Sequence, residues 1–416
     1  MTTLQFYKTI LFAVFCLLAK PSNTQEPLPV IPDSNKIVVM TKFVESIKTI
    51  TPVSLDSVLQ SSLQKRFVPL PDKSVIFSGY DPYFYWFRFH ITNRDTIPRQ
   101  YHILMGPTGQ RYAELFQSNS GKWISCGKTG NQYLFSERPY LYTHYVFPLT
   151  LHPSATDTFY MSIDASHNFK TFAFSLVPPK TLKKMENRVY LLFGILIGIL
   201  LLFGVLNIYL FFSIKEKIHL WYSMYIMFLI FLVMKNEGLD EQFLGNDSET
   251  GYRLTPIMGI GAITIFLLMH VTQLFLNNIS KKHILYRVTS FIKINLLLAA
   301  VIHFIVFYVR PDYKIETLVF EWANRSTVIG VVMILTNCIY SLAKGFKPAL
   351  FILSGTVIFL LGSMERLLVM STPTYLFPPS LFQIGMVIEV AVISFGLMYR
   401  YNLRTPCLSQ FVLRWF

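Results

Sequence analysis

Charged side chains interrupt the apolar stretches in the second half of this sequence. Glu389 lies about nine residues into the last stretch, ~13 Å deep if that stretch is a helix crossing a membrane. Glu321 and Arg325 are four residues apart and share one helix face, while Glu365 and Arg366 are adjacent. Because a charged group inside a membrane span costs a few kcal/mol, such groups are functional candidates. We predict that these five residues form a buried polar switch.

Two other interpretations of these five residues remain open. They could be static pairs that fix helix packing, with Glu321 bound to Arg325 and Glu389 bound to Arg366. They could also mark an ion or proton pathway, because intramembrane carboxylates occur in transporters. The sequence shows no inverted repeat and no pair of spans broken by Gly and Pro, which disfavours a transporter.

A second candidate site lies in the first half of the chain, in the segment YFYWFRFHITN. The alternation of residues places Trp86, Arg88 and His90 on one face of a strand. Aromatic rings and a guanidinium suit a planar or carboxylated ligand, such as a carbohydrate or a small organic anion. We predict a ligand-binding face here. The alternative is that this face belongs to a core or to a strand contact.

Catalysis and cofactor binding are not predicted. The sequence has no G-x-S-x-G, H-E-x-x-H, paired-carboxylate or Gly-rich phosphate motif, so we expect no enzyme. His270 and His303 lie at different depths of their apolar stretches, which argues against a shared metal ion or haem. The four cysteines form no C-x-x-C pair and encode no disulfide framework or zinc site. We therefore expect no cofactor.

The composition places the chain among membrane proteins. Of 416 residues, 52% are hydrophobic and 14% are charged, against about 25% charged in soluble domains. The net charge of +14 would suggest nucleic acid in a soluble protein. Here many of the basic residues flank apolar stretches, where they set the topology, and no nucleic-acid-binding motif is present. We expect the lipid bilayer as a partner and no nucleic acid.

The N-terminal segment, residues 1–25, has the pattern of a secretory signal peptide. Lys8 precedes an apolar run that is too short for a comfortable span, and small polar residues follow it. Cleavage is expected near Thr24 or Gln25, and the alternative is an uncleaved anchor. A signal peptide would place residues 26–185 outside the cytoplasm.

Residues 26–185 combine many aromatic residues with short alternating runs and frequent turn signals. In TFAFSLV, for example, Phe172, Phe174 and Leu176 share one face. Several short strands at this spacing indicate a β-sandwich or jelly roll. We predict an all-β extracytoplasmic domain.

Residues 186–402 contain long apolar stretches that predict an all-α bundle of seven transmembrane helices. The stretches are 189–213, 218–234, 252–276, 288–309, 315–342, 349–370 and 381–399. With the β domain outside, the predicted inner loops and tail carry ten Lys and Arg residues and the outer loops carry four. This distribution follows the positive-inside rule and places the C-terminal tail, 403–416, in the cytoplasm.

This order of parts resembles the bacterial seven-transmembrane receptors with diverse intracellular signalling modules. The first part is similar to their type 2 extracellular domain, through YFYWFRFHITN, AELFQSNSGKW and RPYLYTHYVFPLTLHP. The last stretch, QIGMVIEVAVISFGLMYRYN, is similar to their seventh span, with Gly385, Glu389, Ser394 and Arg400 in recurring places. The resemblance implies a receptor in a bacterial inner membrane that senses a periplasmic ligand and drives a cytoplasmic module.

The sequence departs from the family at its end, because no kinase, cyclase or DNA-binding module follows Arg400. We therefore expect a signalling partner in trans, and a homodimer remains open. The alternatives are an ion- or proton-coupled transporter, a carbohydrate-binding module on a membrane anchor, and the truncated sensor half of a receptor kinase.

Overall fold

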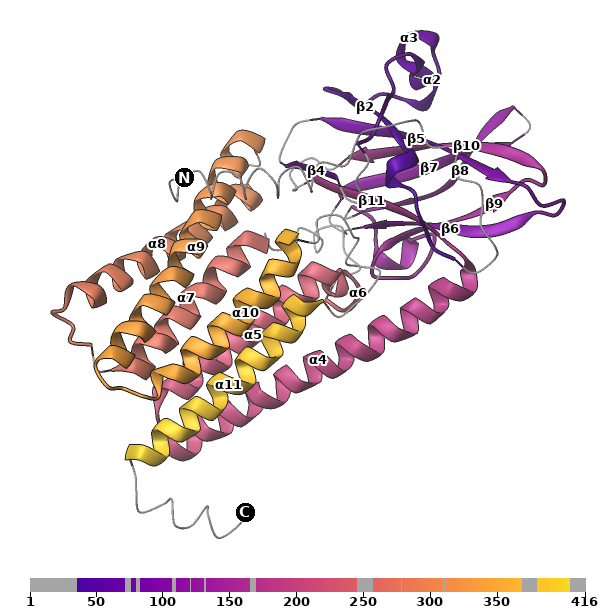
Figure 1. Cartoon of the computed structure of the whole chain (residues 1–416). Helices are drawn as coiled ribbons and strands as arrows, with labels where there is room; N and C mark the ends of the chain where they lie inside the picture. Colours follow the sequence, from indigo (N-terminus) through magenta and orange to yellow (C-terminus); the bar gives the residue numbers. More distant parts are fainter. Residues whose placement is uncertain are drawn as a thin grey trace, which may run out of the picture.

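A computed structural model gives the fold of the protein (Figure 1). It describes residues 36–71, 76–79, 83–106, 110–119, 121–130, 132–164, 170–244, 257–277, 279–309, 312–368 and 380–404. The predicted signal peptide lies outside these residues, as does the predicted tail apart from residues 403 and 404.

The first part of the chain folds into two antiparallel sheets. One has the order β1-β11-β6-β9, with β4 also paired to β11, and the other has the order β3-β2-β5-β10-β7-β8. The strands of the first sheet are β1 (Val38–Val39), β4 (Ile76–Gly79), β6 (Arg99–Gly106), β9 (Tyr145–Leu151) and β11 (Lys170–Val177). Those of the second are β2 (Glu45–Thr49), β3 (Val68–Pro69), β5 (Phe84–Asn93), β7 (Tyr112–Asn119), β8 (Lys122–Thr129) and β10 (Ala155–Asp164).

The core between the sheets follows the alternation of the sequence. Phe87 and Phe89 on β5 pack against Phe172 and Phe174 on β11, with ring centroids 5.0–5.1 Å apart. These buried rings contribute large apolar areas at the centre of one cluster. The predicted sandwich is therefore confirmed, and the residues expected to share its inner face do so.

Short helical turns complete the sandwich. They are η1 (Thr41–Phe43), α2 (Leu55–Val58), α3 (Ser61–Gln64) and η2 (Phe135–Glu137). Val58 and Phe67, which flank α3, pack with Trp86 in a second, smaller core on the outer face of the six-stranded sheet. One face of β5 therefore lines the main core, and the other is covered by a local insertion.

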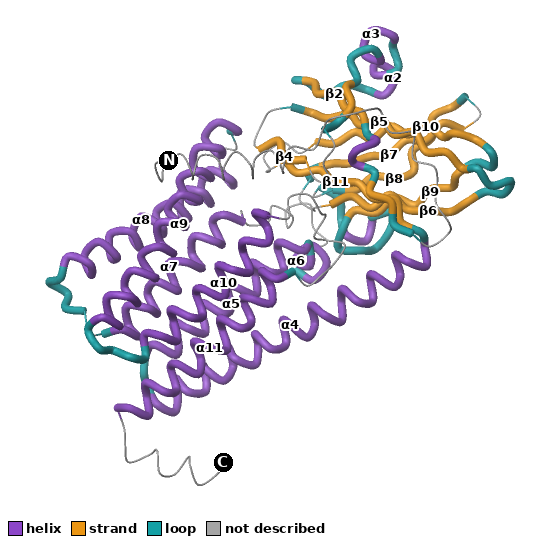
Figure 2. Tube along the Cα trace, in the orientation of Figure 1, coloured by secondary structure: helices purple, strands orange, loops and turns teal. Residues whose placement is uncertain are grey.

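In its described residues, the second part of the chain consists of helices joined by loops (Figure 2). Its long helices are α4 (Pro179–Ile214), α5 (Lys217–Glu237), α7 (Ile257–Leu276), α8 (Ile284–Val309), α9 (Tyr313–Ala343), α10 (Ala349–Leu368) and α11 (Leu381–Arg404). Among the described residues, all but α10 meet the length and hydropathy of a membrane span, and α10 contains the shorter apolar stretch Ala349–Met364. The seven helices coincide with the seven predicted stretches.

The helices run side by side, with the sandwich at one end of the bundle (Figure 1). The C-terminal end of α11 lies at the opposite end (Figure 1). Helix α7 packs against α5, α8 and α9, whereas α4 exposes apolar side chains such as Leu191, Leu202 and Val205. Exposed apolar residues along a span suit contact with lipid. We call the bundle end next to the sandwich the outer end and the opposite end the inner end.

Candidate functional site at the junction of sandwich and helices

The carboxylate of Glu389 is buried at the contact of α11 with α5. Its side chain has no exposed surface, and the Tyr225 hydroxyl donates to Glu389 Oε2 at 2.9 Å. The neighbouring Tyr222 hydroxyl donates to the Val390 carbonyl at 2.7 Å. Glu389 Oε1 is also buried and has no hydrogen-bond partner among the described residues. Two tyrosines of α5 thus hold the middle of α11.

Close packing of α10 on α11 fixes the other side of this helix. A Cβ added at Gly362 would come within 2.5 Å of the Leu381 carbonyl oxygen, and one at Gly385 within 3.2 Å of the Ile358 carbonyl oxygen. Small residues let transmembrane helices approach closely. Gly385, singled out in the sequence, therefore has a packing reason to be glycine.

The other residues of the predicted polar switch do not join Glu389. Glu321 and Arg325 pair at 2.8 Å, and their side chains are 52% and 77% exposed on the outside of the bundle. The prediction that they are buried is wrong, because their face of α9 points away from the other helices. The side chains of Glu365 and Arg366 lie outside the described residues. Glu321 and Arg325 thus form a local pair, as in the static alternative.

The predicted ligand-binding face on β5 carries its three residues side by side. Trp86 is buried beneath the insertion and stacks on Phe116, with ring centroids 5.9 Å apart. Arg88 Nε donates to Glu45 Oε2 at 2.5 Å, and Arg88 Nη1 donates to Gln64 Oε1 at 2.7 Å. Trp86 therefore belongs to a core, as the alternative had it, and the binding role of this face stays a prediction.

Electrostatics on this face follow from the same contacts. Burial lowers the pKa of Arg88, but hydrogen bonds and charge attraction from Glu45 outweigh it, so the pKa is raised overall. Burial, and then the Arg88 charge, lower the pKa of His90. Arg88 is thus a charge already engaged within the fold.

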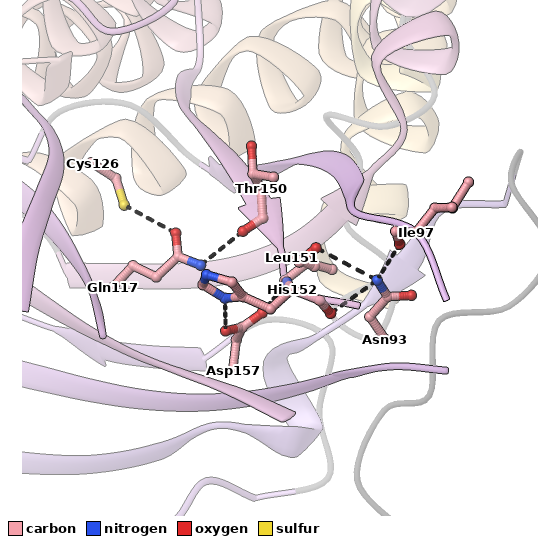
Figure 3. Close-up of polar contacts among 8 residues, drawn as sticks. All are labelled: Asn93, Ile97, Gln117, Cys126, Thr150, Leu151, His152 and Asp157. Carbon is pink, nitrogen blue, oxygen red and sulfur yellow. Dashed lines mark hydrogen bonds and ion pairs between the residues drawn. The ribbon is translucent and has the colours of Figure 1, made fainter. Parts of the chain in front are cut away.

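A separate cleft of about 570 Å³ opens where the edge strands β8 and β9 of the two sheets face each other. Figure 3 shows polar contacts of four residues that line it, Gln117, Cys126, Thr150 and His152, and of their neighbours. Gln117 Nε2 donates to the Thr150 carbonyl at 2.8 Å, and His152 Nδ1 lies 2.6 Å from Asp157 Oδ1. Cys126 also lines the cleft, and burial raises the pKa of its thiol to about 11. The cleft offers mainly uncharged hydrogen-bonding groups beside apolar walls.

The contact between sandwich and bundle centres on a buried ion pair. Arg138, directly after η2, donates through Nη2 to Glu241 Oε2 in α6 (Leu239–Phe243), the short helix after α5. Both side chains are 2% exposed. Arg138 also donates to the Tyr142 and Thr143 carbonyls at 2.9 and 3.4 Å. A buried charge needs such compensation, so this pair fixes the sandwich on the bundle.

Further contacts surround this ion pair. The Tyr140 hydroxyl donates to Glu186 Oε2 at 3.1 Å, and the Tyr190 hydroxyl donates to Gln242 Oε1 at 2.9 Å. Tyr142 is buried in the same apolar cluster as residues of α4 and α5. The junction thus combines an apolar contact with hydrogen bonds to both α4 and α6.

A hydrogen bond joins the end of α5, next to this junction, to the first turn of α11. Gln383 Nε2, in the first turn of α11, donates to Glu237 Oε1 at the end of α5 at 2.5 Å. Gln383 Oε1 accepts from the Ser380 backbone N–H at 2.7 Å. Since only Gly238 separates Glu237 from α6, α6 and α11 are held through the same short stretch of chain.

The inner end of α11 is also packed. Arg400 is buried, and its guanidinium lies 5.4 Å from the centre of the Phe275 ring. Nearby in the bundle, His219 Nδ1 and Asn207 Oδ1 lie 2.9 Å apart between α5 and α4. Movement of α11 would therefore change contacts at the inner end.

Sequence reasoning missed Arg138 and Glu241, which are 103 residues apart. Arg138 opens the segment RPYLYTHYVFPLTLHP, but neither residue was singled out as a candidate. The one available signal was the acidic outer connection GLDEQF, which is too long to be a tight turn. Among the described residues, no cluster of three or more His, Cys, Asp or Glu side chains could hold a metal ion.

Comparison with known proteins matches both parts of the chain. The family described as 7TMR-DISM extracellular 2 matches residues 48–176, and the family described as 7TM diverse intracellular signalling matches residues 189–400. A comparison with curated proteins finds no match. The first match covers most of the sandwich, and the second runs from within α4 to near the end of α11. This chain therefore belongs to the seven-transmembrane receptors with diverse intracellular signalling, with an extracellular β-sandwich on a membrane-spanning bundle.

Proposed function

We propose that this receptor senses a ligand outside the cell through its sandwich and passes a conformational change through α11 to a cytoplasmic partner. The observation that carries the proposal is the buried Arg138–Glu241 pair, which ties the sandwich to the connection between α5 and α7. A charge pair with almost no exposed surface resists sliding, so a displacement of the sandwich would displace α6. The receptor acts by changing shape, without catalysis of its own.

The route through the bundle follows the hydrogen bonds. A displacement of α6 reaches Glu237, and from there Gln383 in the first turn of α11. The Tyr225–Glu389 contact lies farther along the same helix pair, and Arg400 lies at its inner end. The size of any shift is limited by the difference in ligand affinity between the two states. The partner would read the position of the inner end of α11 on the cytoplasmic side.

The proposed ligand is a carbohydrate or a small anion, and the cleft between β8 and β9 is the place we favour for it. The amide of Gln117 and the imidazole of His152 suit hydroxyl groups, and the exposed side chain of Ile124 offers an apolar contact. The face of Trp86, Arg88 and His90 is the second place, with Arg88 already held by Glu45.

Cysteine labelling tests the coupling without knowledge of the ligand. In a chain whose native cysteines are replaced by serine, Tyr399→Cys places a thiol near the inner end of α11, where the native side chain is partly exposed. Its rate of reaction with a water-soluble maleimide is measured with and without Glu241→Gln. We expect this junction change to alter the rate severalfold.

Arg325→Gln serves as the control, because it removes an exposed charge from α9, which packs on α7, α8 and α10. It should leave the labelling rate unchanged. If Glu241→Gln loosens the junction, as judged by protease sensitivity of the sandwich, and the labelling rate of the introduced thiol stays the same, the coupling proposal fails.

A transporter remains the second candidate, because the buried Glu389 Oε1 has no partner among the described residues and could take a proton. Reconstituted vesicles with a pH-sensitive dye distinguish the two functions. Proton flux that is abolished by Glu389→Gln would favour transport. If the wild-type protein gives no more flux than empty vesicles, transport is excluded and the receptor proposal stands.

A further inference from the structure

A lysine inside the membrane region is not used by the proposed signalling route. Lys293 lies in α8, about six residues or ~9 Å beyond Arg287 at the inner end. Its amine lies 2.9 Å from His270 Nδ1 on α7. In the part of the chain that the structure describes, no carboxylate pairs with this amine. A half-buried cation at this depth is costly unless an anion meets it.

Three helices supply the surroundings of Lys293. His270 meets the edge of the Trp221 ring of α5, with centroids 4.4 Å apart, and stacks on Phe266 one turn away at 6.2 Å. All four side chains are partly exposed. Helix α7 packs between α5 and α8, so these partly exposed residues line a strip over α7, of the kind that meets lipid on a membrane span. An acyl chain could lie along Phe266 while a headgroup meets the amine.

The direction of the lysine side chain fits a headgroup at the inner surface. Side chains on a helix lean toward its N-terminus, and α8 begins at the inner end. The Lys293 amine therefore leans back toward the inner surface, as lysines near helix ends do. The tryptophan lies about four residues from the start of α5, a position typical of the interfacial aromatic belt.

The charge of the inner end points to an anionic ligand. Lys217, Lys281, Lys282 and Arg287 are exposed at the ends of α5, α7 and α8 that border the strip. Glu216 is the one acidic residue in the inner connections of these helices. Basic sites between helices at a membrane surface bind the phosphates of anionic lipids. We propose that Lys293, His270 and Trp221 form a binding site for the phosphate headgroup of an anionic phospholipid in the inner leaflet.

Lipid competition on the full chain tests this site. The protein is reconstituted in an equal mixture of phosphatidylglycerol and phosphatidylcholine, and the lipid retained on it is identified by native mass spectrometry. The wild-type protein should retain phosphatidylglycerol preferentially, and Lys293→Gln should lower that preference about fivefold, as expected for one lost phosphate contact. Lys293→Arg should keep the preference, because it keeps the charge.

The matched control is Lys344→Gln, which removes an exposed charge from the connection between α9 and α10 at the same end of the bundle. It should leave the preference unchanged. Equal retention of both lipids by the wild-type protein would overturn the proposal, whether or not the variants fold. So would an unchanged preference in Lys293→Gln. Thermal stabilisation by inorganic phosphate in pure phosphatidylcholine would instead assign the site to a soluble anion. That result would overturn the proposal that the ligand is a lipid.

Discussion

Two Arg–Glu pairs in this molecule have the same chemistry and opposite surroundings. Arg138 and Glu241 join the sandwich to the bundle with side chains that are almost completely buried. Glu321 and Arg325 lie one turn apart on α9 and are largely exposed. A buried pair cannot lose one partner without leaving a charge in an apolar environment, whereas the exposed pair joins two residues of one helix, four positions apart. The first pair can therefore couple two domains, and the second cannot.

The largest effect on stability is expected from breaking the buried Arg138–Glu241 pair. Glu241→Gln leaves the Arg138 guanidinium buried without its counter-charge, which should cost about 3–5 kcal/mol of unfolding free energy. Chemical unfolding in detergent micelles, followed by circular dichroism, gives this value. The double variant with Arg138→Gln should recover part of the loss, and a cost below about 1 kcal/mol for Glu241→Gln alone would contradict the assigned burial.

Acid should weaken the same junction through His144. Burial, and then the neighbouring Arg138 charge, lower the pKa of His144 to about 4. The unfolded chain then binds a proton that the folded chain does not, so stability is complete above about pH 6.5 and falls as the pH drops toward 4. Between about pH 7 and pH 5 the expected loss is about 2 kcal/mol.

The slope of the unfolding free energy against pH measures this effect. His144→Gln should flatten the slope. An identical slope in His144→Gln and the wild-type protein would refute the assignment.

A smaller effect is expected at the contact between α5 and α11. Tyr225→Phe removes the hydroxyl that donates to Glu389 and leaves the carboxyl group without this partner, at a cost of about 1–2 kcal/mol. Tyr209→Phe is the matched control, because that ring lies exposed on α4. Thermal unfolding should separate the two variants, and equal midpoints would show that this hydrogen bond contributes nothing.

The smallest effect belongs to the exposed pair. Arg325→Gln should change the unfolding free energy by about 0.3–0.5 kcal/mol, the range of exposed pairs at this spacing on a helix. The same unfolding assay applies. A loss as large as that of Glu241→Gln would mean that α9 buries this face, for example against a second copy of the chain.

Local patterns in the sequence predicted which parts of the chain form strands and which form helices. The alternation in YFYWFRFHITN predicted the strand and placed Trp86, Arg88 and His90 on one of its faces, since neighbouring side chains on a strand point to opposite sides. Long apolar stretches predicted the helices, because each must satisfy its own backbone in lipid. Glu389 was recognisable as a candidate because a charge in such a stretch is rare.

The burial of individual side chains was not available from these patterns. Both lipid and the bundle interior are apolar, so the sequence around Glu321 does not show which face of α9 points outward. The strand pattern likewise could not show that the insertion around α3 covers Trp86. In both places the expected site residues acquired structural partners instead.

Periodicity and length within a segment were enough to predict the β-sandwich and the seven apolar helices, because both depend on local patterns. The tertiary structure alone decided which groups meet: Arg138 with Glu241, Gln383 with Glu237, and the edges of β8 and β9 around the cleft. These contacts join residues far apart along the chain, and the energy of each depends on burial that no local pattern encodes.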